Sequence, residues 1–185
     1  LPVSYLQICS ITKSRVSGII STMKNKNVLV TGIGGNVGQG ILRNIIAEGL
    51  PIDIYGCNTI EFSAGNHFCL KTFKVPFAFD VNYIEEIISI VKENEIDLII
   101  PSTDHEVFYL SKHREAIPCN IAVSGANSAE IYLDKYKTYL HFEKYGIPFA
   151  KTSLPGGYVA TSAEIIAKPR EGRGSRGLVI NPVDL

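Results

Sequence analysis

Short apolar runs and amphipathic helical patterns alternate over most of the chain, and this alternation limits the possible folds more than any other feature. Runs typical of strands lie at 28–30, 52–55, 70–75, 96–100 and 120–123. One helical pattern ends at about residue 48, one follows Asp80 as its expected N-cap, and one covers 106–114. Because strands joined by helices usually pair in parallel, we predict an α/β fold with a Rossmann-like open, mainly parallel sheet and helices on both faces.

The pattern changes near Gly125, and the remaining residues follow a different order. Asp134 is expected to cap a helix that stops at Gly146. Strands are expected at 164–168 and 178–180, with a loop rich in glycine and arginine between them. We therefore expect three parts: an extension at 1–22 that precedes Met23, a Rossmann-like domain at 23–125, and a truncated second domain at 126–185.

Composition argues against several classes of function. The 185 residues include 18 basic and 18 acidic side chains, so there is no electrostatic case for a nucleic acid or a membrane as partner. No apolar stretch reaches the ~18 residues of a membrane span, and the first 22 residues do not resemble a secretory signal. The four cysteines form no CxxC pair and no zinc-like spacing, so we expect small buried residues in a reducing cytoplasm.

A glycine cluster separates the first expected strand from the helix that follows it. Glycines there let a ligand approach the backbone, and the helix N-terminus offers free N–H groups to an anion. The dinucleotide pattern GxGxxG fails because Val37 occupies the position of the third glycine. The looser pattern TGxxGxxG fits through Gly32, Gly35 and Gly38. A tight turn that binds nothing is the alternative interpretation.

Two observations count against an NAD(P)-binding oxidoreductase. Such a site needs an acidic residue after the second strand to bind the ribose hydroxyls. Here that strand runs into Asn58, and the nearest acid is Glu61. In addition, none of the nine tyrosines has a lysine four residues later, so the Tyr-x-x-x-Lys pair is absent. The oxidoreductase remains an alternative hypothesis.

The strongest constellation for ligand binding lies at 168–177, where a lysine ends an expected strand and a glycine- and arginine-rich loop follows. Glycine backbone N–H groups can turn inward, and the cationic side chains supply positive charge, so the pattern is typical of a loop that covers a polyphosphate. An exposed basic hairpin without a ligand is the alternative. The candidate residues are Lys168, Arg170, Gly172, Arg173, Gly174, Ser175, Arg176 and Gly177.

Three segments of the second half resemble the opening of an ATP-grasp domain: Asp134-Lys135-Tyr136-Lys137-Thr138, residues 145–152, and Ile166-Ala167-Lys168-Pro169 with its glycine loop. The likeness is to proteins similar to the large subunit of carbamoyl-phosphate synthase. In the first half, 55–58, 63–65, 75–76 and 100–106 look like the preceding, pre-ATP-grasp domain of that family. The resemblance covers 27 to about 181 and implies a pre-ATP-grasp domain followed by the incomplete first subdomain of an ATP-grasp fold.

The resemblance also implies roles for particular residues. Lys135 and Lys168 would approach the phosphates of ATP, and the loop at 172–177 would cover them. In this family ATP phosphorylates a carboxylate, and an amine, ammonia or a thiol then displaces phosphate from the acyl phosphate. The first domain would form the substrate side, with Gly34, Gly35, Asn36, Asp104 and Glu106 as candidates. A helix cap is the alternative role for Asp104.

The Mg²⁺ ligands of the family lie well beyond the glycine loop. The resemblance therefore implies that they lie downstream of Leu185 and that this chain has no metal site of its own. We expect an inactive N-terminal portion of a cytoplasmic ligase that uses ATP and Mg²⁺. Its partners would be a small-molecule carboxylate, an amine or ammonia, and either further copies of itself or the missing C-terminal part. A non-catalytic binding or assembly module is the third hypothesis.

Overall fold

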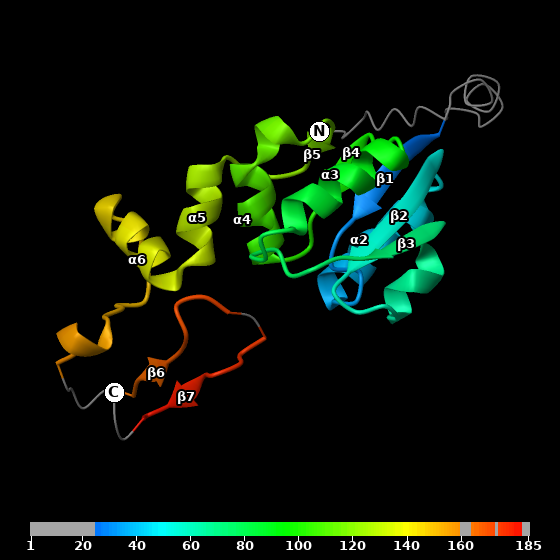
Figure 1. The fold of residues 1–185 in the computed structure, drawn as a ribbon. Coiled ribbons are helices and arrows are strands. Elements are labelled where there is room, and N and C mark those ends of the chain that lie inside the picture. The colour runs from blue at the N-terminus through cyan, green and yellow to red at the C-terminus, as the bar shows by residue number, and fades with distance from the viewer. Residues whose placement is uncertain (1–24, 160–163, 173, 183–185) are drawn as a thin grey trace, which may run out of the picture.

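Five parallel strands form one open sheet in the computed structural model, which describes residues 25–159, 164–172 and 174–182. They are β1 (Lys26–Val30), β2 (Ile52–Asn58), β3 (Lys71–Lys74), β4 (Leu98–Ile100) and β5 (Asn120–Ile121). The strand order is β3-β2-β1-β4-β5, and each neighbouring pair is parallel (Figure 1). The predicted open, parallel sheet is confirmed. The extension predicted at 1–22 lies outside the described residues.

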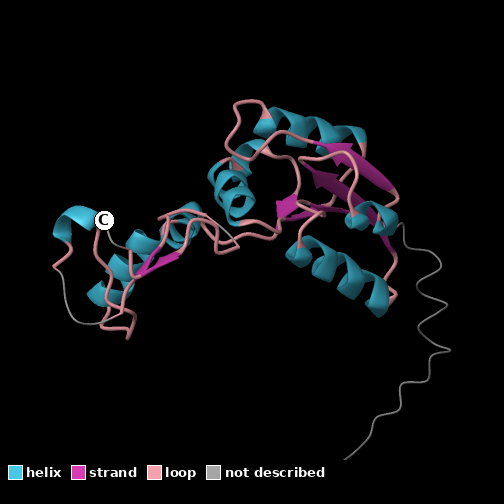
Figure 2. Cartoon of the chain, turned by 90° about the horizontal axis from the view of Figure 1, so that it is seen from below, coloured by secondary structure: helices cyan, strands magenta, loops and turns pink. Residues whose placement is uncertain are grey.

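Helices cover both faces of this sheet (Figure 2). On one face α2 (Asn36–Glu48) packs Leu42 against Val28 and Val30. On the other face α3 (Tyr83–Glu93) and α4 (Asp104–Lys112) pack around Leu29. Successive side chains of a strand point to opposite faces, so the apolar run of β1 supplies both cores. This explains why a strand that is buried on both sides reads as a continuous apolar run.

The helix boundaries agree with the sequence-based prediction in one helix and differ in two. α2 ends at Gly49, whose φ of 63° is the left-handed conformation that favours glycine. The cap predicted at Asp80 is wrong, because α3 begins after Asn82 and the Asp80 carboxylate accepts a hydrogen bond from the Phe77 N–H at 2.9 Å. That bond closes a turn ahead of the helix. α4 starts two residues earlier than predicted, with Thr103 as its N-cap.

Beyond the sheet, α5 (Ala126–Leu133) packs against α4 and leads to α6 (Lys135–Lys144) (Figure 1). The sequence predicted α6 and its cap but not α5. A short antiparallel pair follows, β6 (Ile166–Ala167) and β7 (Val179–Ile180). The 3₁₀ turns are η1 (Ala64–Phe68), η2 (Arg114–Ala116) and η3 (Pro155–Gly157). Within the described part of the chain, no helix has the length and apolar character needed to cross a membrane.

Candidate functional site

The strand order reverses between β1 and β4, and ligands of open α/β sheets bind beside the carboxyl ends of the strands at such a point. The two loops that leave these strands are tied together. The Thr31 N–H donates to the Ile100 carbonyl at 3.1 Å, and the Ser102 hydroxyl donates to the Gly32 carbonyl at 3.2 Å. The glycine cluster and the segment 102–106 therefore lie side by side, and both contain predicted substrate-side residues.

The N-terminus of α2 is open at this edge of the sheet. Gly35 is the N-cap, and no side chain among the described residues caps the helix. Gly35 and Asn36 are exposed, and Gly34 is half-buried. At Gly38 an added Cβ would lie 2.6 Å from the Gly32 carbonyl oxygen, so glycine is required by the close approach of the helix to the turn. The N–H groups of the first helical turn therefore remain available to an anion.

Asp104 and Glu106 occupy different environments in the first turn of α4. Asp104 is exposed, whereas Glu106 is only 7% exposed. The Thr103 hydroxyl donates to the Glu106 carboxylate at 2.8 Å and accepts from the Glu106 N–H at 3.3 Å. Thr103 is thus the cap, and the helix-cap alternative for Asp104 is wrong. Because an added Cβ on Gly32 would lie 3.1 Å from Glu106 Oε2, we place Glu106 beneath the turn as a support.

Burial raises the pKa of the Glu106 carboxyl, and hydrogen bonds from Thr103 oppose this shift without cancelling it. The protonated form is therefore favoured by folding, and stability is lost as the pH rises from the unfolded value of ~4.3 through the folded pKa. We expect Glu106→Gln, which removes the charge, to raise the melting temperature at pH 7 and to flatten its dependence on pH above about pH 4. Thermal melts across this pH range test the prediction.

The matched control is Glu85→Gln, because Glu85 is an exposed glutamate of α3. Its melting temperature should follow that of the wild type at every pH. If the melting temperature of Glu106→Gln depends on pH as that of the wild type does, ionisation of Glu106 does not destabilise the folded protein.

A second group of predicted residues forms where α6 begins. The Asp134 carboxylate accepts hydrogen bonds from the N–H groups of Tyr136 at 2.9 Å and Lys137 at 3.3 Å, which confirms the predicted cap. It also forms an ion pair with Arg170, whose Nε donates at 3.2 Å. Burial acts to raise the pKa of Asp134, but the hydrogen bonds from Arg170 and the helix outweigh it and lower that pKa. The Arg170 side chain is therefore held at the N-terminus of α6 by its contacts with Asp134.

Lys135 connects the same helix to the glycine loop. Its backbone N–H donates to the Arg170 carbonyl at 3.0 Å. Its Nζ donates to the carbonyls of Arg170 at 3.1 Å and Gly172 at 3.2 Å. The structure therefore brings together three of the residues predicted for the ATP site, although Lys135 is 35 positions from Arg170 and 37 from Gly172 in the sequence.

The other loop residues are exposed and less constrained by contacts. Lys168 forms no hydrogen bond or ion pair with any residue that the structure describes. At Gly177 the φ is 72° and an added Cβ would lie 2.9 Å from Pro169 Cγ, so the loop folds back on its own start. Arg173 lies outside the described residues. The remaining predicted residues are exposed: Gly174, Ser175 and Arg176.

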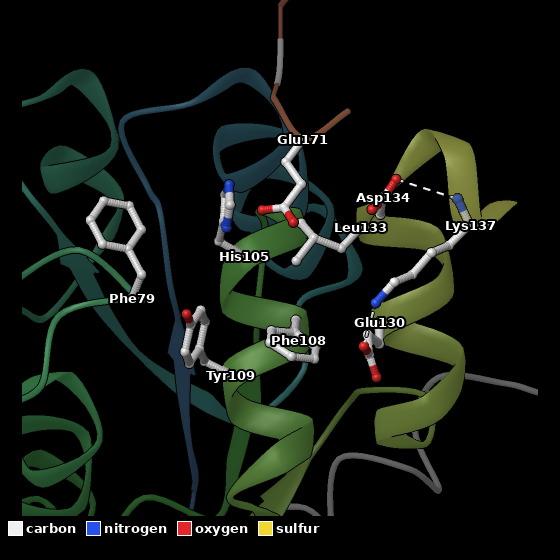
Figure 3. Close-up of a pocket in the computed structure, with 9 residues that line it drawn as sticks. All are labelled: Phe79, His105, Phe108, Tyr109, Glu130, Leu133, Asp134, Lys137 and Glu171. Atoms are coloured by element: carbon white, nitrogen blue, oxygen red, sulfur yellow. Dashed lines mark hydrogen bonds and ion pairs between the residues drawn. The ribbon is translucent and has the colours of Figure 1, made fainter. Parts of the chain in front are cut away.

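A small pocket of about 260 Å³ lies beside this second group and was not predicted (Figure 3). Aromatic side chains of α4 line one side, and acidic side chains of α5 and of the glycine loop line the other. The available sequence signal was the spacing of His105, Phe108 and Tyr109, which places three rings along one helix. In the part of the chain that the structure describes, no group of three His, Cys, Asp or Glu side chains is arranged to hold a metal ion.

Comparison with protein families finds one match in the first half of the chain. Residues 28–123 match the model of the PylC-like N-terminal domain. The matched range contains the whole parallel sheet apart from the first two residues of β1, and both loops at the point where the strand order reverses. No curated protein matches the sequence.

Solved structures share the fold over most of the chain. An L-amino acid ligase from Bacillus licheniformis is 15% identical, with a TM-score of 0.57 over 82% of this chain and 39% of its own. A biotin carboxylase domain from Hydrogenobacter thermophilus, in complex with MgADP, ADP and bicarbonate, is 19% identical, with a TM-score of 0.59 over 85% and 38%. An ADP complex of N5-carboxyaminoimidazole ribonucleotide synthetase is 15% identical, with a TM-score of 0.63 over 85% and 41%.

These similarities confirm the resemblance to the ATP-grasp superfamily at the level of the fold. The chain spans about two fifths of the length of those proteins. The particular likeness to carbamoyl-phosphate synthase remains a prediction.

Proposed function

Because the chain belongs to the PylC-like N-terminal domain family, we propose that it forms the substrate side and the beginning of the ATP-binding domain of an ATP-dependent ligase. In the proposed reaction a carboxylate oxygen attacks the γ-phosphorus of ATP, and ADP leaves. An amine or ammonia then attacks the acyl carbon of the acyl phosphate, and phosphate leaves. The nearest chemical analogy is the activity of carbamoyl-phosphate synthase. The cytoplasm is the proposed location.

One observation carries this proposal: Lys135 is hydrogen-bonded to the loop that follows β6. The ammonium of Lys135 donates to two loop carbonyls, which are weaker acceptors than phosphate oxygens. Both kinds of bond are charge-assisted because the ammonium is ionised, but a phosphate oxygen also carries negative charge and so attracts the ammonium more strongly than a neutral carbonyl does. A nucleotide phosphate would therefore displace the carbonyls of Arg170 and Gly172 and draw the loop over itself. Lys168 and Arg176 are exposed and can follow the loop.

The other end of the site suits an anionic substrate. The open N-terminus of α2, with Gly34, Gly35 and Asn36, offers N–H groups and a positive helix dipole to a carboxylate. In this proposal Asp104 contacts the substrate from the first turn of α4, and Glu106 holds the glycine turn in place. Among the described residues no three His, Cys, Asp or Glu side chains are arranged to hold a metal ion. We therefore assign Mg²⁺ coordination to parts of the enzyme outside these residues.

The proposal is tested by calorimetry on the natural protein that contains these residues. Mg-ATP should bind in the micromolar range, while NAD and NADP should give no heat. Added carboxylates should then stimulate ADP release. The 185-residue chain alone should bind Mg-ATP in the millimolar range or not at all. Two charge-assisted contacts, together ~3–6 kcal/mol, scarcely offset an association cost of ~4–15 kcal/mol.

Binding of NAD or NADP in preference to Mg-ATP would instead favour the oxidoreductase. Absence of any nucleotide binding to the natural protein would favour a non-catalytic assembly module. Tight binding of ATP to the 185-residue chain would show that the nucleotide site lies elsewhere in these residues.

A further inference from the structure

The pocket beside α6 combines aromatic walls with acidic side chains (Figure 3). Four rings line it, and two of them meet edge to face: Phe79 and His105, with ring centroids 5.9 Å apart. Phe108 and Tyr109 of α4 form a second edge-to-face pair at 5.1 Å. The negative faces of such rings attract a cation, and their apolar surfaces pack against its alkyl chain.

The charges around the pocket leave one carboxylate available. Glu130 forms an ion pair with Lys137, and Asp134 forms one with Arg170. The Glu171 side chain points from the glycine loop into the space between α4 and α5 (Figure 3). Its carboxylate has no hydrogen bond or ion pair among the residues that the structure describes. The pocket therefore has a partner for one positive charge.

The volume limits the size of the ligand. At about 260 Å³ the pocket lies below the ~300–1,000 Å³ of sites that hold drug-sized ligands. An adenine nucleotide does not fit, whereas a small aliphatic amine does.

We propose that this pocket binds a primary alkylammonium group, with Glu171 as its counter-ion and the four rings around its alkyl chain. The site rests on its own geometry and needs no nucleotide. Its assignment as the site of the amine nucleophile rests on the proposed ligase function. It is placed for that role, because Asp134 lines the pocket and holds Arg170, whose carbonyl accepts hydrogen bonds from Lys135.

The position of Glu171 gives the pocket a link to the glycine loop. Glu171 lies between Arg170 and Gly172, the two residues whose carbonyls accept from Lys135. An amine that binds Glu171 therefore contacts the same loop that would cover the phosphates.

The test is an NMR titration of the 185-residue chain without nucleotide, with 1,5-diaminopentane as probe and glutarate as the anion of matched length. Diaminopentane should shift the ring signals of His105 and Tyr109, and glutarate should not. Glu171→Gln should weaken diaminopentane binding about tenfold, through loss of a charge-assisted contact. The control Glu164→Gln changes an exposed glutamate that does not line the pocket and should leave binding unchanged.

Equal shifts with glutarate, or equal binding by wild type and Glu171→Gln, would overturn the proposal. Because no nucleotide is present, such a failure leaves the proposed ATP site untouched. Conversely, if the natural protein that contains these residues binds the amine but not Mg-ATP, the pocket is retained and the ligase function is refuted.

Discussion

Replacing Gly38 with alanine is expected to lower the free energy of unfolding by ~1–3 kcal/mol, the range of a side chain forced into a packed site. The added Cβ would lie 2.6 Å from the Gly32 carbonyl oxygen and 2.9 Å from Ile33 Cα. Both are backbone atoms, which cannot move aside as a flexible side chain does. A melting temperature measured by circular dichroism should fall by ~2–4 °C for each kcal/mol in a chain of this size.

The same helix offers a matched control at Gly40. An added Cβ there meets nothing within 4 Å. Gly40→Ala should therefore stabilise α2 by ~0.5–1 kcal/mol, because alanine loses less conformational entropy than glycine on folding. If the two variants change the melting temperature equally, the close approach of α2 to the glycine turn is not what requires Gly38.

Removing a lysine of the proposed nucleotide site is expected to weaken Mg-ATP binding by the natural protein about tenfold or more. Each of Lys135 and Lys168 would contribute a charge-assisted contact of ~1.5–3 kcal/mol, and 1.4 kcal/mol corresponds to a factor of ten. The measurement is calorimetry on Lys135→Ala and Lys168→Ala. Lys135→Ala should also loosen the loop at Gly172, since it loses the Nζ bonds to the Arg170 and Gly172 carbonyls. The backbone N–H bond to Arg170 and the ion pair between Asp134 and Arg170 remain.

Lys144→Ala is the control, because Lys144 ends α6 at the opposite end from the loop. It carries the same charge on the same helix, and its removal should leave the dissociation constant unchanged. Equal weakening by all three substitutions would indicate a general effect of charge rather than contacts with the phosphates.

The parallel sheet could be predicted from the sequence because its signals are local. The apolar run of β1 is buried on both faces, and that of β4 is buried at Ile99 and half-buried at Leu98 and Ile100. Glycine or proline follows each run. The cap at Asp134 was equally readable, since an aspartate before a helical pattern accepts N–H groups of the first turn without help from distant residues.

Other features depend on contacts between distant residues. α5 has no capping side chain and only two buried residues, Ala129 and Leu133, so its local signal is weak and packing against α4 supports it. The sequence named Glu106 as a substrate-side candidate but could not show its burial, which depends on the distant Gly32 turn. The pocket is lined by residues between positions 79 and 171. The spacing of the three rings on α4 is local, but no sequence pattern predicts that Phe79 and Glu171 lie beside them.

The position of the nucleotide is tested most directly by hydrogen exchange of the natural protein with and without Mg-ATP. We expect slower exchange in two segments, the loop at 168–177 and the start of α6 at 135–138, because Lys135 and the loop would close on the phosphates together. The N-terminus of α2 should remain unprotected until a carboxylate is added. Protection at Gly32 to Gly38 by Mg-ATP alone, with no change at 168–177, would place the nucleotide at the other end of the site and contradict the proposed function.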